Sequence, residues 1–104
     1  MIRGIGVDIL SIDRIDFKIA RKVLSSEELD IFNSITNEKL KKEYLAERFA
    51  VKEALFKADN AYFNYDKVSV LTDESGKPYL KDINGFVSIA HDGGMVCAFV
   101  VLNN

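Results

Sequence analysis

The sequence predicts a single α+β domain, with one strand at the N-terminus, a helical block containing one long helix, and antiparallel strands at the C-terminus. Three observations support this prediction. Residues 2–10 form an apolar run with two glycines, apolar side chains recur with a helical period from residue 40 to residue 56, and the period shortens towards 2 after residue 64. No repeat, linker or low-complexity segment is visible, so we assign residues 1–104 to one domain.

The composition narrows the class of protein. Of the 104 residues, 48% are hydrophobic and 29% are charged, which suits one globular domain with a modest core. A domain of this size buries a smaller share of its surface than a larger domain does, so oligomer formation is a reasonable way to gain burial. The net charge of −2 argues against a general nucleic-acid-binding protein. Neither a signal peptide nor a membrane-spanning run is recognisable, and we therefore expect a cytoplasmic protein.

The N-terminal run, residues 2–10, is predicted to be a strand buried on both faces, because most of its side chains are apolar or β-branched. Gly4 and Gly6 indicate bends or close backbone approach. Asp8 is the one acidic residue in this run. A carboxylate in such a setting needs a cation or hydrogen-bond donors, or else it marks the exposed end of the strand. The residues alone leave both interpretations of Asp8 open.

Two short helices are expected next. Asp13 is the predicted N-cap of a helix that ends near residue 23, with an apolar stripe at every fourth position. Ser25 and Glu28 have the spacing of a capping box, which predicts a second helix from there to about residue 33.

A basic run lies within the first of these helices. Residues 14–22 carry four basic side chains against one acidic side chain, a local net charge of +3. Arg14, Lys18 and Arg21 have i, i+4, i+7 spacing, which would bring them to one side of a helix. Such a run is either a solvated face or a docking surface for an acidic partner.

The long helix is predicted to start at the N-cap Thr36, and neither proline nor glycine interrupts it. It contains the segment FAVKEALFKA at residues 49–58, in which Lys52, Glu53 and Lys57 stand among apolar residues. These charges belong either to a solvated helix edge, with Glu53 and Lys57 as an i,i+4 pair, or to a site.

The C-terminal third is expected to form an antiparallel meander. Turn residues separate its strands, and the Asp-Gly-Gly run at residues 92–94 is a strong hairpin signal. Cys97 lies in the last apolar run with no activating polar neighbour, so we expect a buried thiol rather than a nucleophile. The predicted strands cover residues 67–72, 77–80, 86–90 and 95–102.

Four short strings, taken in order, resemble the holo-[acyl-carrier-protein] synthases, the short-chain class of 4′-phosphopantetheinyl transferases. They are IRGIGVDI at residues 2–9 with Arg14-Ile15 following, RFAVKEALFKA at residues 48–58, Gly76-Lys77-Pro78, and Ser88-Ile89-Ala90-His91. The resemblance spans nearly the whole chain and implies the phosphopantetheinyl transferase-like fold. It also implies transfer of the phosphopantetheine arm of coenzyme A to a serine of apo acyl carrier protein, with release of adenosine 3′,5′-bisphosphate, in support of fatty acid biosynthesis.

The resemblance further implies roles for single residues. Asp8 and Glu53 match the family's metal carboxylates, and Mg²⁺ prefers one or two carboxylates together with phosphate oxygens and waters. Lys57, one turn beyond Glu53, completes the expected catalytic set at the pyrophosphate. The expected contacts with coenzyme A are Arg48, Lys57, Ser88 and His91, and the expected contacts with the acidic carrier protein are Arg14, Lys18 and Arg21. Without the resemblance, His91 is equally well interpreted as a solvated or merely hydrogen-bonded side chain.

The chain departs from the family pattern at two places. Ala90 stands where the family has a second serine, and Asp59-Asn60-Ala61 stands where a Gly-rich loop usually follows. One hydroxyl contact and the approach of the loop backbone to coenzyme A are therefore expected to differ. The family's short members form trimers with the active site between subunits, so a homotrimer is expected here.

Two other classes of function fit parts of the sequence. A non-catalytic binding module would tolerate the loss of Asp8 or Glu53, yet both are present. A different Mg²⁺-dependent phosphotransferase or nucleotide hydrolase is disfavoured, because no P-loop string G-x-x-x-x-G-K-[ST] occurs.

Overall fold

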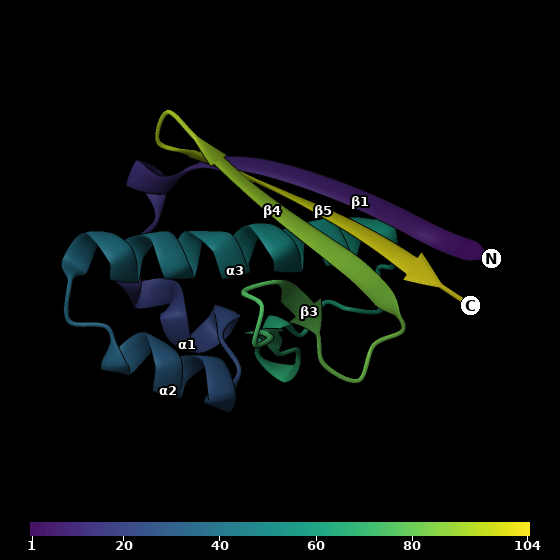
Figure 1. Ribbon diagram of the computed structural model, residues 1–104, viewed down its shortest axis with the longest axis horizontal. Coiled ribbons are helices and arrows are strands. Elements are labelled where there is room, and N and C mark those ends of the chain that lie inside the picture. The colour runs from purple at the N-terminus through teal and green to yellow at the C-terminus, as the bar shows by residue number, and fades with distance from the viewer.

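The computed structural model describes residues 1–104. In chain order its strands and helices are β1 (Ile2–Ser11), α1 (Ala20–Val23), α2 (Ser26–Ser34), α3 (Glu38–Ala58), β2 (Val70–Thr72), β3 (Pro78–Leu80), β4 (Gly85–Asp92) and β5 (Met95–Asn103), and the 3₁₀ turns η1 to η3 cover Ile12–Arg14, Phe17–Ile19 and Tyr65–Lys67. The long helix α3 is the middle layer: a three-stranded sheet covers one side, and α1, α2 and the β2–β3 hairpin cover the other (Figure 1). This architecture confirms the α+β prediction.

The three-stranded sheet has the order β1–β5–β4 and is antiparallel throughout. Asp8 on β1 pairs with Ala98 on β5, and Ala98 pairs with Ile89 on β4. The strands β2 and β3 pair only with each other, in a separate sheet. The predicted meander is therefore wrong in its pairing, because the N-terminal strand rather than β3 joins the C-terminal hairpin.

The sheet has a covered inner face and an open outer face. On the inner face β1 lies against α3, and a Cβ atom at Gly6 would lie 1.8 Å from the carbonyl oxygen of Ala54, so only glycine fits there. On the outer face Ile5, Val7 and Ile9 are 58%, 49% and 65% exposed. The expectation of a strand buried on both faces is thus wrong, because α3 covers one side only.

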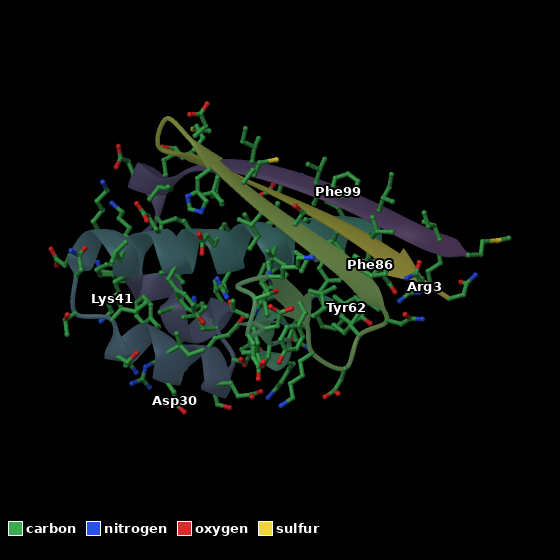
Figure 2. All side chains as sticks on the ribbon, in the orientation of Figure 1. Arg3, Asp30, Lys41, Tyr62, Phe86 and Phe99 are labelled. Carbon is green, nitrogen blue, oxygen red and sulfur yellow. The ribbon has the colours of Figure 1, made fainter.

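The outer face continues across all three strands. Strand alternation buries Val96, Ala98, Val100 and Leu102 of β5 against α3. The same alternation turns Phe99 outward, and Phe86 of β4 is also exposed on the sheet (Figure 2). Cys97 is a free thiol on the outward side of β5 and is only partly buried, so the expectation of a buried thiol is also corrected.

The first predicted helix is broken. Asp16, not Asp13, provides the N-cap by accepting a hydrogen bond from the Lys18 N–H, and only residues 20–23 are α-helical. The break has a physical cause: Ile15 takes an extended conformation and packs its side chain into the core. None of the helices combines the length and the apolar character needed to cross a bilayer.

The caps of the other two helices agree better with the sequence. Both hydrogen bonds of the Ser25–Glu28 capping box are formed at the start of α2, as predicted. The N-cap of α3 is Asn37 rather than Thr36, and its side chain accepts a hydrogen bond from the Leu40 N–H at 3.0 Å. The cap shifts by one residue because asparagine caps a helix at least as well as threonine.

Candidate functional site

Two carboxylates from distant parts of the chain share one hollow. Asp8 lies on the inner face of β1 and Glu53 lies on α3, and together they line a hollow of about 390 Å³. Phe49 and Arg14 contribute to the same lining. Asp8 is in the middle of its strand with a side chain that is 16% exposed, so the alternative interpretation as an exposed strand end is wrong.

Lys57 joins this pair of carboxylates. Its Nζ donates to Asp8 Oδ1 at 3.2 Å and to the Val7 carbonyl oxygen at 2.9 Å. Lys57 forms no ion pair with Glu53, although these residues are four apart on α3. The i,i+4 interpretation is therefore replaced by a contact between the helix and the strand.

Tyr65 is a site residue that the sequence did not indicate. Burial, followed by the negative charge of Glu53 and a hydrogen bond with it, raises the pKa of Tyr65 to about 12. Its ring packs edge-on against Phe49, with 6.3 Å between the ring centroids. A neutral phenol thus stands beside Glu53 and near Asp8. No periodicity could have identified it, because it begins a 3₁₀ turn between α3 and β2.

Lys52 points away from this hollow and into the core. Its side chain is fully buried, and its Nζ lies 2.8 Å from Glu28 Oε1. Burial lowers the pKa of Lys52, and the carboxylate of Glu28 opposes this shift. The same ammonium also donates to three backbone carbonyls, those of Val23, Tyr65 and Val68, at 2.7–2.8 Å. Lys52 therefore ties α3 to α1, α2 and the segment that carries Tyr65.

Arg48 and His91 meet through a third side chain, Glu47. Arg48 Nη1 donates to Glu47 Oε1 at 3.1 Å, and Glu47 Oε2 pairs with His91 Nε2. The rest of the Arg48 guanidinium is bound to the protein, with Nε on the Val70 carbonyl oxygen at 3.2 Å and Nη2 on Thr72 Oγ1 at 3.3 Å. The sequence did not single out Glu47, since its partner His91 lies 44 residues away.

Ser88 lies on the other face of the sheet from His91. The two residues are three apart on β4, so their side chains alternate to opposite faces. Ser88 lines a hollow of about 330 Å³ with Lys77 and Pro78. The structure thus brings Ser88 to the Gly76-Lys77-Pro78 string, but it separates Ser88 from His91 within one chain.

The two groups of charged residues belong to opposite edges of the sheet. Asp8 and Lys57 lie at the β1 edge, whereas His91 lies at the β4 edge, and β5 runs between them. Within one chain the predicted site residues therefore lie at two edges of the sheet, and Ser88 lies on its other face.

The basic run does not form one helical face. Arg14, Lys18 and Arg21 are all exposed, but the broken helix removes the spacing on which their common face was predicted. Arg14 lines the hollow of Asp8 and Glu53, whereas Lys18 and Arg21 line a neighbouring one that also contains Asp30.

The segment that replaces the family's Gly-rich loop is held in place by side chains. Asp59 Oδ2 accepts from Arg3 Nη1 at 2.6 Å, and its Oδ1 accepts from the Ala61 N–H at 2.9 Å. These two donors lower the pKa of the Asp59 carboxyl. Arg3 and Tyr62 lie close together at this end of the molecule (Figure 2).

The carboxylate hollow fits Mg²⁺ better than it fits a metal held entirely by protein. No group of three or more His, Cys, Asp or Glu side chains is placed to hold a metal ion. Mg²⁺ is usually bound by one or two protein carboxylates, and substrate phosphates and waters complete its octahedral coordination. Asp8 and Glu53 line one hollow and supply two such carboxylates.

These features define a class of protein. The family model described as the 4′-phosphopantetheinyl transferase superfamily matches residues 4–100, and the chain belongs to this family. Within it, the chain is 49% identical to the holo-[acyl-carrier-protein] synthase of Petrotoga mobilis over 82 residues, covering 79% of this chain and 69% of that protein. It is 39% identical to the holo-[acyl-carrier-protein] synthase of Staphylococcus aureus over 98% of this chain and 96% of the relative.

The fold agrees with a solved structure of the same kind. A holo-(acyl-carrier-protein) synthase from Bacillus anthracis, crystallised in complex with CoA (3′,5′-ADP), superposes with a TM-score of 0.86 at 31% identity, covering 98% of this chain and 96% of that one.

Proposed function

We propose that the protein transfers the 4′-phosphopantetheine arm of coenzyme A to a serine hydroxyl of an apo acyl carrier protein, in support of fatty acid biosynthesis. The serine oxygen attacks the phosphorus that bears the arm, and the bond to adenosine 3′,5′-bisphosphate breaks. The observation that carries this proposal is the shared hollow of Asp8 and Glu53, with the Lys57 ammonium against Asp8, in a chain of this superfamily.

Each residue of the hollow has a part in this reaction. Asp8 and Glu53 would hold Mg²⁺, which offsets negative charge on the pyrophosphate when it is bound. Lys57 is 53% exposed, so its ammonium can reach a phosphate oxygen while Asp8 limits its freedom. A positive charge aimed at oxygens that gain negative charge lowers the barrier to transfer. Arg48 and His91 are proposed to bind phosphate groups of the nucleotide, and Ser88 is proposed to bind another part of coenzyme A.

A homotrimer is the proposed active form. The apolar outer face supports this proposal, because an exposed apolar patch that crosses a sheet is typical of an interface. The separation of Asp8 from His91 supports it too, since a neighbouring subunit can bring its β4 edge to the β1 edge of the first. Sedimentation of the wild type and of Phe99→Asp tests this: we expect trimer for the first, and monomer without transferase activity for the second. A fully active monomer would overturn the proposal.

The carrier protein is proposed to dock on Arg14, Lys18 and Arg21. All three are exposed, and Arg14 borders the hollow where the serine would have to arrive. Complementary charge speeds encounter with an acidic partner. Reversal of Arg14 and Arg21 to Glu should raise the KM for the carrier about tenfold, or about 1.4 kcal/mol, at low salt. The KM for coenzyme A should change less than the KM for the carrier, because of the two residues only Arg14 borders the hollow of Asp8 and Glu53.

Mass spectrometry of the carrier protein tests the reaction itself. Incubation of the protein with coenzyme A, Mg²⁺ and an apo carrier protein should add the mass of one phosphopantetheine group to the carrier. A carrier of unchanged mass, with coenzyme A left intact, would support a non-catalytic binding module. Hydrolysis of coenzyme A without transfer would support a nucleotide hydrolase.

The cytoplasmic location stays a prediction, which imaging of a tagged protein would check.

A further inference from the structure

A carboxylate lies between the arginine and the histidine that are proposed to bind phosphate groups of coenzyme A. Glu47 contacts Arg48 through Oε1 at 3.1 Å and His91 through Oε2. The Glu47 side chain is 23% exposed, so a ligand in solvent can reach it. Both oxygens of one carboxylate are thus used on these two side chains, as the oxygens of a phosphate would be.

Most of the N–H donors of Arg48 are already used by the protein. Its side chain is 6% exposed, and its Nε and Nη2 are bound to Val70 and Thr72. Glu47 is the charged partner among these three contacts, so another anion can take its place. At His91, Nε2 is the ring nitrogen that Glu47 occupies.

We infer that Glu47 acts as an internal competitor for the phosphate of coenzyme A, and so sets the affinity of this site. The inference rests on the proposed function, because it takes Arg48 and His91 as phosphate ligands. A phosphate can take the place of Glu47 on Arg48 Nη1 and His91 Nε2 only after the Glu47 carboxylate turns away. While Glu47 remains close, its negative charge repels the phosphate. Coenzyme A binding therefore includes the cost of breaking the contacts of Glu47 with Arg48 and His91.

Calorimetric titration of the full-length protein with coenzyme A and with adenosine 3′,5′-bisphosphate tests the inference. Glu47→Gln keeps an oxygen that can accept from Arg48 but removes the charge. We expect it to bind both compounds about fivefold more tightly, the effect of one unit charge at about 4 Å in a largely aqueous setting. Glu43→Gln is the matched control, because it removes the same charge one turn earlier on α3 without touching Arg48 or His91. Its affinity should match that of the wild type.

A double-mutant cycle separates competition from general electrostatics. In the His91→Ala background, Glu47→Gln should tighten coenzyme A binding by clearly less than fivefold, since one of the two side chains that Glu47 contacts is gone. Glu47→Asp, which shortens the side chain by one methylene, gives a second variant if Glu47→Gln does not fold. It should also tighten binding, by a smaller factor.

The outcomes distinguish a failure of the inference from a failure of the proposed function. Unchanged or weaker binding by Glu47→Gln, together with a loss of affinity in His91→Ala, would overturn the inference and leave the proposed function standing. In that case Glu47 would hold His91 in place for the ligand. If the wild type bound neither compound, both the proposed function and the inference would fail.

Discussion

Two lysines lie five positions apart on α3, and each pairs with a carboxylate from another part of the chain. The two pairs differ in burial and in the number of their other hydrogen bonds. Lys52 and Glu28 are 2.8 Å apart and both side chains are fully buried. Lys57 and Asp8 are 3.2 Å apart, with side chains 53% and 16% exposed. The comparison teaches which of the charges in FAVKEALFKA supports the fold and which is free to act on a ligand.

The buried pair has no capacity for a ligand. The three N–H donors of Lys52 serve four protein acceptors. The oxygens of Glu28 also accept from the Ser25 N–H and the Val70 N–H, each at 2.8 Å. Such a saturated network fixes the relative positions of the elements it joins. At the open pair, Lys57 has only one further partner, the Val7 carbonyl oxygen, and can turn towards a ligand.

The largest expected effect comes from breaking the buried pair. Lys52→Met keeps the length of the side chain but leaves Glu28 as an uncompensated buried charge, so unfolding should become easier by about 3–5 kcal/mol. This is a large share of the roughly 5–15 kcal/mol that stabilises a domain of this kind. Urea denaturation followed by circular dichroism measures the change.

The matched control for this prediction is an exposed pair. Lys81 and Glu27 are 2.9 Å apart, with side chains 44% and 45% exposed. Lys81→Met should change the urea midpoint little, because water already solvates both charges. Equal effects of Lys52→Met and Lys81→Met would mean that the buried network does not stabilise the fold.

The second effect concerns the open carboxylates. Glu53→Gln and Asp8→Asn preserve shape but remove the charge that Mg²⁺ requires, so each should lower the transfer rate by about 10³-fold at saturating coenzyme A. The urea midpoint should stay close to that of the wild type, in contrast to Lys52→Met. Near wild-type rates in either variant would contradict the metal assignment.

The contrast between the pairs also explains what the sequence could predict. Capping of α2 by Ser25 and Glu28, the extent of α3 and the β4–β5 hairpin were predicted, because neighbours in the chain determine each of them. Asp8 and Glu53 were identified only because their strings resemble a known family. Their shared hollow depends on β1 packing against α3, which no local pattern encodes.

Long-range partners account for most of what the sequence did not predict. The burial of Lys52 depends on Glu28, 24 residues away, and one-dimensional periodicity cannot distinguish such a lysine from a solvated one. The break in the first helix arises because the core draws in Ile15, which overrides a good helical pattern. Tyr65 becomes a neighbour of Glu53 only through the fold.

The third effect concerns Lys57, the lysine of the open pair. Lys57→Ala should weaken coenzyme A binding and lower kcat, together reducing kcat/KM by about 10²-fold, because the charge acts on phosphates that gain negative charge during transfer. Stopped-flow or coupled assays across coenzyme A concentrations separate the two parameters. An increase in KM with unchanged kcat would limit Lys57 to binding. Stability should change far less than in Lys52→Met, even though each variant removes one lysine from α3.

The smallest effect concerns Tyr65, which contacts Lys52 of the buried pair and lies beside Glu53 in the hollow of the open pair. Its carbonyl oxygen accepts from the buried Lys52 at 2.8 Å, and its phenol lies beside Glu53. The buried network thus sets where the phenol stands, and the phenol in turn orients a carboxylate of the open site. Tyr65→Phe removes one hydrogen bond, worth about 0.5–1.5 kcal/mol, while its ring can still pack on Phe49.

We expect Tyr65→Phe to raise the Mg²⁺ concentration for half-maximal transfer about threefold, within the range of that one hydrogen bond. Tyr62→Phe is the control, because Tyr62 lies near Arg3 rather than near Glu53. A purely structural role for Tyr65 would alter the urea midpoint and leave the Mg²⁺ dependence unchanged. That result would separate the buried pair from the chemistry of the open one, whereas a shift in Mg²⁺ dependence at constant stability would show that the Tyr65 phenol acts on the carboxylate site.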